Sequence, residues 1–297
     1  MLKNRRFQGI LLALISAVFF ALANTLTGVA NNGGTNPFTM TATRFILPAV
    51  LLFLILLLKG KPVLLERRAG TIAAALGVVT MVYTFALLKA IELLPVTIAI
   101  LLFYLFPILT AFMLGLFGWG KVSTRMMVSA FIAFFGLGLT LAVQFDELST
   151  IGMWAGVASA VGFAICCAVS HTLMQGQDSW RVTLYISGVA TLSMAVVMTF
   201  AGDFRLPESG TGWAGFMFSH LLYGTAIIGF YASISLVGAA ASTFFVNLEP
   251  IVVVGAGYVL LGQTIMPLQM VGVAIVVAAL VYASRSKEPE PVLSSAE

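Results

Sequence analysis

The stretch GILLALISAVFFA at residues 9–21 returns in altered form as GMWAGVASAVGFA at residues 152–164. The two stretches are 152 − 9 = 143 positions apart, and the identical pairs include Ser16/Ser159, Ala17/Ala160, Val18/Val161, Phe20/Phe163 and Ala21/Ala164. The same offset, without a gap, places FYLFPIL at 103–109 over VNLEPIV at 246–252. Two distant matches at one offset indicate an internal duplication, and this duplication decides the fold.

The composition requires a lipid environment. Of the 297 residues 60% are hydrophobic and 9% are charged, whereas an ordinary soluble domain has about 25% charged residues. A membrane-spanning helix needs about 20 mostly apolar residues. Ten such segments fit along the chain, at 8–30, 37–58, 70–92, 95–118, 124–143, 151–174, 181–201, 213–236, 239–261 and 267–284. The sequence therefore predicts an all-α integral membrane protein with no soluble domain.

The duplication divides these segments into two five-helix halves, 8–143 and 151–286, followed by a tail at 287–297 that we expect to be disordered. Because five is odd, the second half enters the membrane from the opposite side, which makes an inverted repeat. Many transporters are built this way, since the symmetry supplies one conformation open to each side. The alternative is that duplication only enlarged a helical bundle.

The basic residues predict that both termini are cytoplasmic, because short cytoplasmic loops are rich in Lys and Arg. With this orientation the inside segments hold 12 of the 15 basic residues: Lys3, Arg5, Arg6, Lys59, Lys61, Arg67, Arg68, Lys121, Arg125, Arg181, Arg285 and Lys287. The high isoelectric point of about 9.2 reflects these flanking charges and not a nucleic-acid surface.

Three segments in this order carry a family resemblance: TATRFILPAVLLF at 41–53, LFPILTAFMLGL at 105–116 and LEPIVVVGAGYVLLG at 248–262. With the two five-helix halves, they resemble the EamA branch of the drug/metabolite transporter superfamily. Within that branch the chain is most similar to bacterial amino-acid exporters of the aromatic-amino-acid exporter group called YddG. The resemblance implies a multi-pass carrier in the bacterial inner membrane that exports amino acids, apolar and aromatic ones among them, by alternating access.

The chain departs from the family pattern at two places. Members often have a Gly-Glu pair after the fourth and ninth spans, where this chain reads Gly118-Trp119-Gly120 and Gly262-Gln263. A coupling role for those acids therefore does not transfer to this chain.

Two prolines in equivalent spans mark the expected substrate site. Pro107 and Pro250 lack an N–H, so we expect the carbonyls of Phe103 and Val246 to lose their helical partners. Such carbonyls are tolerated at mid-membrane only where protein or a water-filled cavity satisfies them, although a simple packing kink is the alternative. Tyr104 and its repeat mate Asn247 lie three residues before these prolines and are candidates to line the cavity.

Two charges lie deep within the spans, Arg44 and Glu249. An ionised side chain in the membrane needs a partner, a proton or water. We consider two hypotheses, a structural Arg44–Glu249 pair and a Glu249 that titrates during transport. Because residues two apart on a helix are separated by roughly 200°, either Asn247 or Glu249 faces the lumen.

Other candidates would grip an apolar or aromatic substrate between polar anchors. These candidates are Asn24, Tyr83, Phe103 and Phe244. We expect neither a metal nor a cofactor. The expected partners are a small-molecule substrate and the lipid bilayer, with the chain as a monomer.

Two other functions, a membrane enzyme and a channel, would require motifs of their own. A membrane enzyme would need a catalytic motif, and no HExxH, GxSxG or phosphate loop occurs in the sequence. A channel would need a filter or ring-forming charges, and neither pattern is present. An exporter of drug-like or other metabolites by proton antiport is the closest alternative.

Overall fold

The computed structural model describes residues 2–120, 122–141, 149–201, 204–261 and 264–284, and within these ranges every regular element is helical. The elements are α1 (Leu2–Asn32), α2 (Pro37–Thr43), α3 (Ile46–Leu58), α4 (Arg67–Leu93), α5 (Val96–Phe103), α6 (Phe106–Leu116), α7 (Thr124–Thr140), α8 (Thr150–Met174), α9 (Ser179–Ala201), α10 (Gly210–Val237), α11 (Ala239–Phe245), η1 (Val246–Leu248), α12 (Glu249–Leu261) and α13 (Pro267–Ser284). The tail at 287–297, expected to be disordered, lies outside the described residues.

Within the described ranges, nine helices or joined helix pairs are long and apolar enough to cross a membrane. Each falls on one of the expected segments, and three segments are each covered by a broken helix: α2 with α3, α5 with α6, and α11 with α12. The remaining expected segment holds α7, which is apolar but only 17 residues long. Large apolar side chains such as Phe135 and Phe200 are exposed on the outer surface, as a lipid-facing protein requires.

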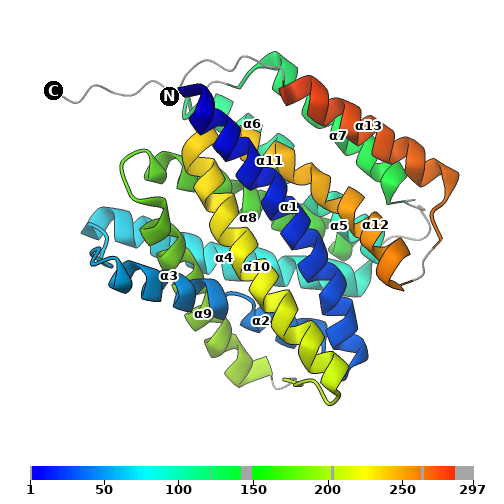
Figure 1. Cartoon of the computed structure of the whole chain (residues 1–297), viewed down its shortest axis with the longest axis horizontal. Helices are drawn as coiled ribbons and strands as arrows, with labels where there is room; N and C mark the ends of the chain where they lie inside the picture. The colour runs from blue at the N-terminus through cyan, green and yellow to red at the C-terminus, as the bar shows by residue number, and fades with distance from the viewer. Residues whose placement is uncertain (1, 121, 142–148, 202–203, 262–263, 285–297) are drawn as a thin grey trace.

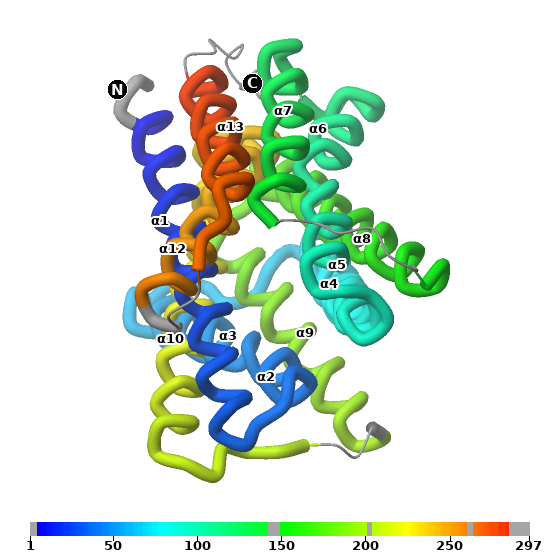
Figure 2. Tube along the Cα trace, turned by 90° about the vertical axis from the view of Figure 1, so that its right-hand side faces the viewer, coloured from blue at the N-terminus to red at the C-terminus, as the bar shows by residue number. Residues whose placement is uncertain are grey.

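Two helix pairs join the halves, and each pair has one helix from either half. Helix α1 packs against α10, and α8 packs against α4 (Figures 1 and 2). A Cβ on Gly9 of α1 would overlap Val237 of α10. A Cβ on Gly152 of α8 would lie 2.7 Å from the Leu94 side chain, just beyond α4. Since 9 + 143 = 152 and 94 + 143 = 237, one contact occurs twice, once in each pair. The duplication is therefore also a symmetry of the packing.

Outer helices cover this core on two sides. Helix α13 lies along α7, and a Cβ on Gly272 would be 2.6 Å from the carbonyl oxygen of Gly136 (Figure 1). Helix α9 packs on α3 and α4, with Val189 against Gly77. These pairs leave α1, α4, α8 and α10 with the broken helices as the lining of the centre.

Each broken span is interrupted within four residues before a proline. The interruptions lie at 44–45, 104–105 and 246–248, and the prolines are Pro48, Pro107 and Pro250. A proline removes one helical hydrogen bond and its ring clashes with the carbonyl four residues earlier. The break before Pro48 was not predicted, although the same rule applies to it. The Val246 carbonyl loses its α-helical partner because Pro250 has no N–H, but a 3₁₀ turn lets the Glu249 N–H donate to it instead.

Candidate functional site

The three breaks place polar residues inside the bundle. Arg44 lies at the first break, Tyr104 at the second, and Glu249 is the first residue of α12 after the third. A helix N-terminus carries a partial positive charge that favours a carboxylate. The interruptions therefore supply positions for charged and polar side chains that a continuous apolar helix would not.

Glu249 is held by two neutral donors. The Asn24 side-chain amide donates to its carboxylate at 2.7 Å, and the Tyr104 hydroxyl also hydrogen-bonds to it. Asn24 lies on α1, so three helices meet at this carboxylate. Asn24 is exposed and Glu249 is half-buried, so the group is reached from outside the packed core. A carboxylate has about four acceptor positions, and two of them remain for a ligand.

Arg44 faces the ring of Tyr223 on α10. Its guanidinium carbon is 4.6 Å from the ring centroid, and the guanidinium donates a hydrogen bond to the Tyr223 hydroxyl. The Arg44 Nε atom is buried and has no hydrogen-bond partner. Arg44 acts on Glu249 electrostatically but makes no ion pair with it; in the described ranges the ion pairs are Lys61–Asp178 and Lys89–Glu92. The hypothesised Arg44–Glu249 ion pair is thus not formed, because Glu249 takes neutral partners and Arg44 stacks on an aromatic ring. We call Asn24, Arg44, Tyr104, Tyr223 and Glu249 the charged pole.

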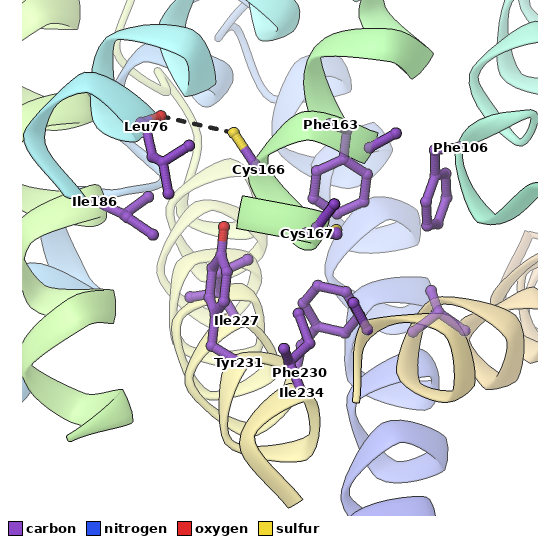
Figure 3. Close-up of a cluster of buried hydrophobic side chains, with 14 of the residues drawn as sticks. Leu76, Phe106, Phe163, Cys166, Cys167, Ile186, Ile227, Phe230, Tyr231 and Ile234 are labelled. Carbon is purple, nitrogen blue, oxygen red and sulfur yellow. Dashed lines mark hydrogen bonds between the residues drawn. The ribbon is translucent and has the colours of Figure 1, made fainter. Parts of the chain in front are cut away.

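Beside the charged pole lies a group of aromatic rings, which we call the aromatic pole: Tyr83, Phe103, Phe106 and Phe163. The ring centroids of Phe106 and Phe163 are 4.6 Å apart, and Tyr83 and Phe103 lie 5.3 and 5.4 Å from Phe163. Tyr104 joins the two poles, since its ring centroid is 5.6 Å from that of Phe106. Figure 3 shows Phe106, Phe163 and Phe230 close together in this cluster. Flat apolar groups pack favourably on such rings.

The duplication does not repeat the charged pole. Phe106 is the repeat mate of Glu249, because 106 + 143 = 249. The mates of the other members are equally uncharged: Cys167 for Asn24, Ser187 for Arg44, Asn247 for Tyr104 and Thr80 for Tyr223. The charged pole therefore has no charged counterpart at the equivalent positions, which hold Phe106 and otherwise small or uncharged polar residues.

Two predicted site residues lie elsewhere. Asn247 is only 3% exposed, and its side-chain amide donates to the Phe244 carbonyl at 2.7 Å, within its own broken span. Phe244 packs with residues of α7 and α13. Of the alternatives Asn247 and Glu249, the structure gives the accessible position to Glu249. Asn24, Tyr83, Tyr104, Phe103 and Arg44 are brought together with Glu249 in the two poles.

Sequence reasoning did not select Phe106, Phe163 or Tyr223 for the site. The chain has 23 Phe residues, and most lie in apolar spans where composition cannot separate lipid-facing from central positions. One usable signal was present, because Phe106 aligns with Glu249 and Phe163 with Phe20 at the offset of 143. Repeat mates of a polar residue are candidates for the same site.

In the part of the chain that the structure describes, no three His, Cys, Asp or Glu side chains gather into a group that could hold a metal ion. The two cysteines are buried free thiols. Cys166 donates a weak hydrogen bond to the Leu76 carbonyl at 3.6 Å, which links α8 to α4 (Figure 3). Their role is packing.

Comparison with known proteins agrees with the repeat. The model of the EamA-like transporter family matches residues 7–142 and again residues 150–285, and 150 − 7 = 143 is the offset of the duplication. A solved structure titled only "Crystal structure of protein" has the same fold, with a TM-score of 0.79 and 17% identity over 93% of this chain and 98% of that one. No curated protein matches the chain. The chain belongs to the EamA-like transporter family and is a multi-pass membrane transporter of small molecules.

Proposed function

We propose that this transporter carries amino acids with apolar or aromatic side chains, exporting them across the bacterial inner membrane by alternating access as a monomer. The observation that carries the proposal is the adjacency of the two poles. Glu249 would accept from the substrate ammonium group, Arg44 would bind its carboxylate, and the aromatic pole would hold its side chain.

The energetics of buried charge support a zwitterionic substrate. Glu249 has only neutral partners, and the Nε atom of Arg44 is buried without any. Charges at mid-membrane are costly unless they are paired or hydrated. A zwitterion supplies a cation for Glu249 and an anion for Arg44, so binding relieves both costs. Arg is suited to this task because its planar guanidinium matches a carboxylate with two parallel hydrogen bonds.

One observation favours the runner-up, export of drug-like organic cations by proton antiport. Glu249 lacks a cationic partner next to an aromatic pole, and aromatic rings with a carboxylate are also what an organic cation requires. Such a substrate would use Glu249 and the rings but not Arg44. The role of Arg44 therefore separates the two functions.

A binding competition with three related ligands tests the proposal. The ligands are phenylalanine, phenethylamine, which lacks the carboxylate, and 3-phenylpropionate, which lacks the amine. Glu249→Gln should weaken phenylalanine and phenethylamine by about tenfold or more, and Arg44→Gln should weaken phenylalanine and phenylpropionate similarly, since a hydrogen bond to a charged group contributes about 1.5–3 kcal/mol.

The matched control is Glu92→Gln, which removes an exposed carboxylate paired with Lys89 on the surface. It should leave all three affinities unchanged. Strong phenethylamine binding that does not respond to Arg44→Gln, together with no phenylalanine binding, would establish the organic-cation function instead.

A further inference from the structure

His220 on α10 is held between two hydrogen-bonding groups at the edge of the charged pole. Its Nδ1 atom is 2.7 Å from the Phe216 carbonyl oxygen, one turn earlier on the same helix. Its Nε2 atom is 2.7 Å from the hydroxyl of Thr43, the last residue of α2. The Phe216 ring also stacks on the imidazole, with the ring centroids 4.2 Å apart. His220 therefore has a fixed orientation and ties α10 to the break between α2 and α3.

The donors and acceptors around His220 suit an imidazolium with both nitrogens protonated. A carbonyl oxygen can only accept, so Nδ1 carries a hydrogen and donates it to Phe216. The Thr43 hydroxyl has one hydrogen, which it donates to the Thr39 carbonyl oxygen at 2.7 Å. Towards His220 this hydroxyl is then an acceptor, so Nε2 must donate as well. With a neutral imidazole, the single hydroxyl hydrogen would have to serve both Nε2 and the Thr39 oxygen.

The duplication does not repeat this bridge. Gly77 is the repeat mate of His220 and Ile186 that of Thr43, since 77 + 143 = 220 and 43 + 143 = 186. A Cβ on Gly77 would lie 2.9 Å from the Ile186 carbonyl oxygen, so the equivalent contact is a close packing of backbone without polar side chains. The imidazole and the hydroxyl thus occur only at the copy of the contact that adjoins Arg44.

Arg44 is the charged group that acts on His220. It follows Thr43 directly, and its guanidinium stacks on Tyr223, which lies one turn beyond His220 on α10. From the loop before α10, the Arg205 backbone N–H donates to the Thr39 hydroxyl at 2.9 Å, one turn from Thr43. An imidazolium at His220 would therefore stand next to a second cation, and the two would repel each other unless an anion bound beside them.

The other helices packed against α10 carry their charged groups away from His220 in the described ranges. Helices α3 and α11 contain none. The basic residues of α1 lie in its first two turns, near Gly9, which contacts the Val237 end of α10. His171 of α8 contacts Gly238, and Arg181 of α9 follows Trp180, which clusters with Ile228, two turns beyond His220. Glu249 acts on Tyr223.

We propose that His220 is a proton-binding and positioning residue of the transport site, whose imidazolium stands beside Arg44 and adds a second positive charge where the substrate carboxylate binds. The proton and the carboxylate favour each other, because each offsets the cost of the other charge within the membrane. Carboxylate affinity therefore rises as the pH falls through the titration of His220. A proton on Glu249 would instead compete with a substrate cation. The carboxylate ligand rests on the proposed function, but the proton site does not.

Nitrogen NMR of protein with isotope-labelled histidine tests the proton site without a ligand. The chain has two histidines, so His171→Gln leaves the signals of His220 alone. We expect both ring nitrogens to be protonated at about pH 6 and only one at about pH 8. Thr43→Val removes the acceptor but keeps the side-chain shape and should reduce the doubly protonated form at about pH 6, whereas Thr43→Ser should retain it. A neutral ring from about pH 8 down to about pH 5 would overturn the proposal.

Binding of 3-phenylpropionate measures the link to the carboxylate. The protein carries Glu249→Gln, so that titration of Glu249 does not contribute. We expect the affinity to be about tenfold higher at about pH 6 than at about pH 8, a usual size for coupling between two sites. The difference should persist in His171→Gln and vanish in His220→Gln, whose neutral amide can still donate to Thr43.

Two results would contradict the link. An affinity that rises equally in His220→Gln would show that the proton binds elsewhere and would overturn the role of His220. If 3-phenylpropionate binds at neither pH although NMR finds the imidazolium, the carboxylate link fails together with the proposed function, and the proton site alone stands.

Discussion

At the scale of single residues, the proposed substrate site is built around Glu249, whose carboxylate receives hydrogen bonds only from neutral groups. Asn24 and Tyr104 hydrogen-bond to Glu249 but bring no positive charge, so the place of a cationic partner is left to a ligand. Arg44 is kept apart from it by stacking on Tyr223. Two opposite charges that lie near each other without pairing are unusual in a membrane interior, where pairing is the ordinary solution.

Tyr104→Phe tests this arrangement with the smallest change. Loss of the hydroxyl removes one of the two donors to Glu249, so we expect phenylalanine affinity to fall about tenfold, the cost of one charged hydrogen bond. Isothermal titration calorimetry measures the phenylalanine affinity. The control is Tyr258→Phe, because Tyr258 is 57% exposed on the outer surface; if both variants bind like the original protein, Tyr104 does not position Glu249.

Asp178 gives a pH prediction outside the membrane-spanning segments. Partial burial acts to raise the pKa of Asp178, but hydrogen bonds from Lys61 and from the Trp180 and Arg181 backbone outweigh it, so its pKa is lowered from 3.8. A lowered carboxylate pKa stabilises the folded state above its ordinary value, and this contribution is lost as the pH falls through the folded-state pKa. Because the pair is exposed, the contribution is about 0.2–1 kcal/mol.

The expected result is a small deficit in thermal stability for Asp178→Asn at pH 5 to 8, which disappears as the medium is acidified below the ordinary pKa of 3.8. Thermal unfolding of both proteins in detergent across this range measures it. A deficit that persists or grows in acid would show that the carboxylate charge is not what Asp178 contributes.

A site residue can be predicted from the sequence when its polarity differs from that of the residues around it. Arg44, Glu249, Asn24 and Tyr104 stand out because each is polar within an apolar span. Phe106 and Phe163 do not, because a phenylalanine facing lipid and one facing the centre look alike in sequence. Asn247 is a candidate because it is the repeat mate of Tyr104 and lies three residues before Pro250, yet its side-chain amide donates to the Phe244 carbonyl in its own span, a local bond that the backbone geometry determines.

At the scale of elements, the breaks before Pro48, Pro107 and Pro250 explain why charged and polar side chains reach the centre. Two of the three breaks are predicted from the sequence, because Pro107 and Pro250 are repeat mates of each other, whereas Pro48 has no proline as its repeat mate. The 3₁₀ turn that satisfies the Val246 carbonyl was not predictable from the proline alone. Proline fixes where a helix is interrupted, but neighbouring packing decides how the chain passes the interruption.

Pro250→Ala tests whether the break positions the carboxylate. Alanine restores the missing N–H and allows α11 to continue into α12, which would rotate Glu249 away from Asn24. We expect phenylalanine affinity to fall about tenfold with folding intact, because the hydrogen bonds to Glu249 are lost. Isothermal titration and thermal unfolding measure the two effects, and Pro62→Ala in the α3–α4 loop is the control. Unchanged affinity in Pro250→Ala would separate the break from the site.

At the scale of the whole molecule, the duplication provides the scaffold and its divergence provides the chemistry. The contact of Gly9 with Val237 and that of Gly152 with Leu94 preserve the original symmetry. The replacement of a Glu249 equivalent by Phe106, and of glycine contacts by Ala69 and Ile72, breaks it. The first difference leaves Glu249 without a charged repeat mate, and the second leaves a surface groove between α4 and α8 where α1 and α10 are in close contact.

The most direct test of the central claim is counterflow uptake of radiolabelled phenylalanine by liposomes that contain the purified protein and unlabelled phenylalanine. We expect saturable uptake with a transient overshoot, retained in Glu92→Gln and reduced about tenfold or more in Glu249→Gln, in line with the loss of a charged contact. Uptake that does not saturate, or a Glu249→Gln variant that transports like the original protein, would contradict it.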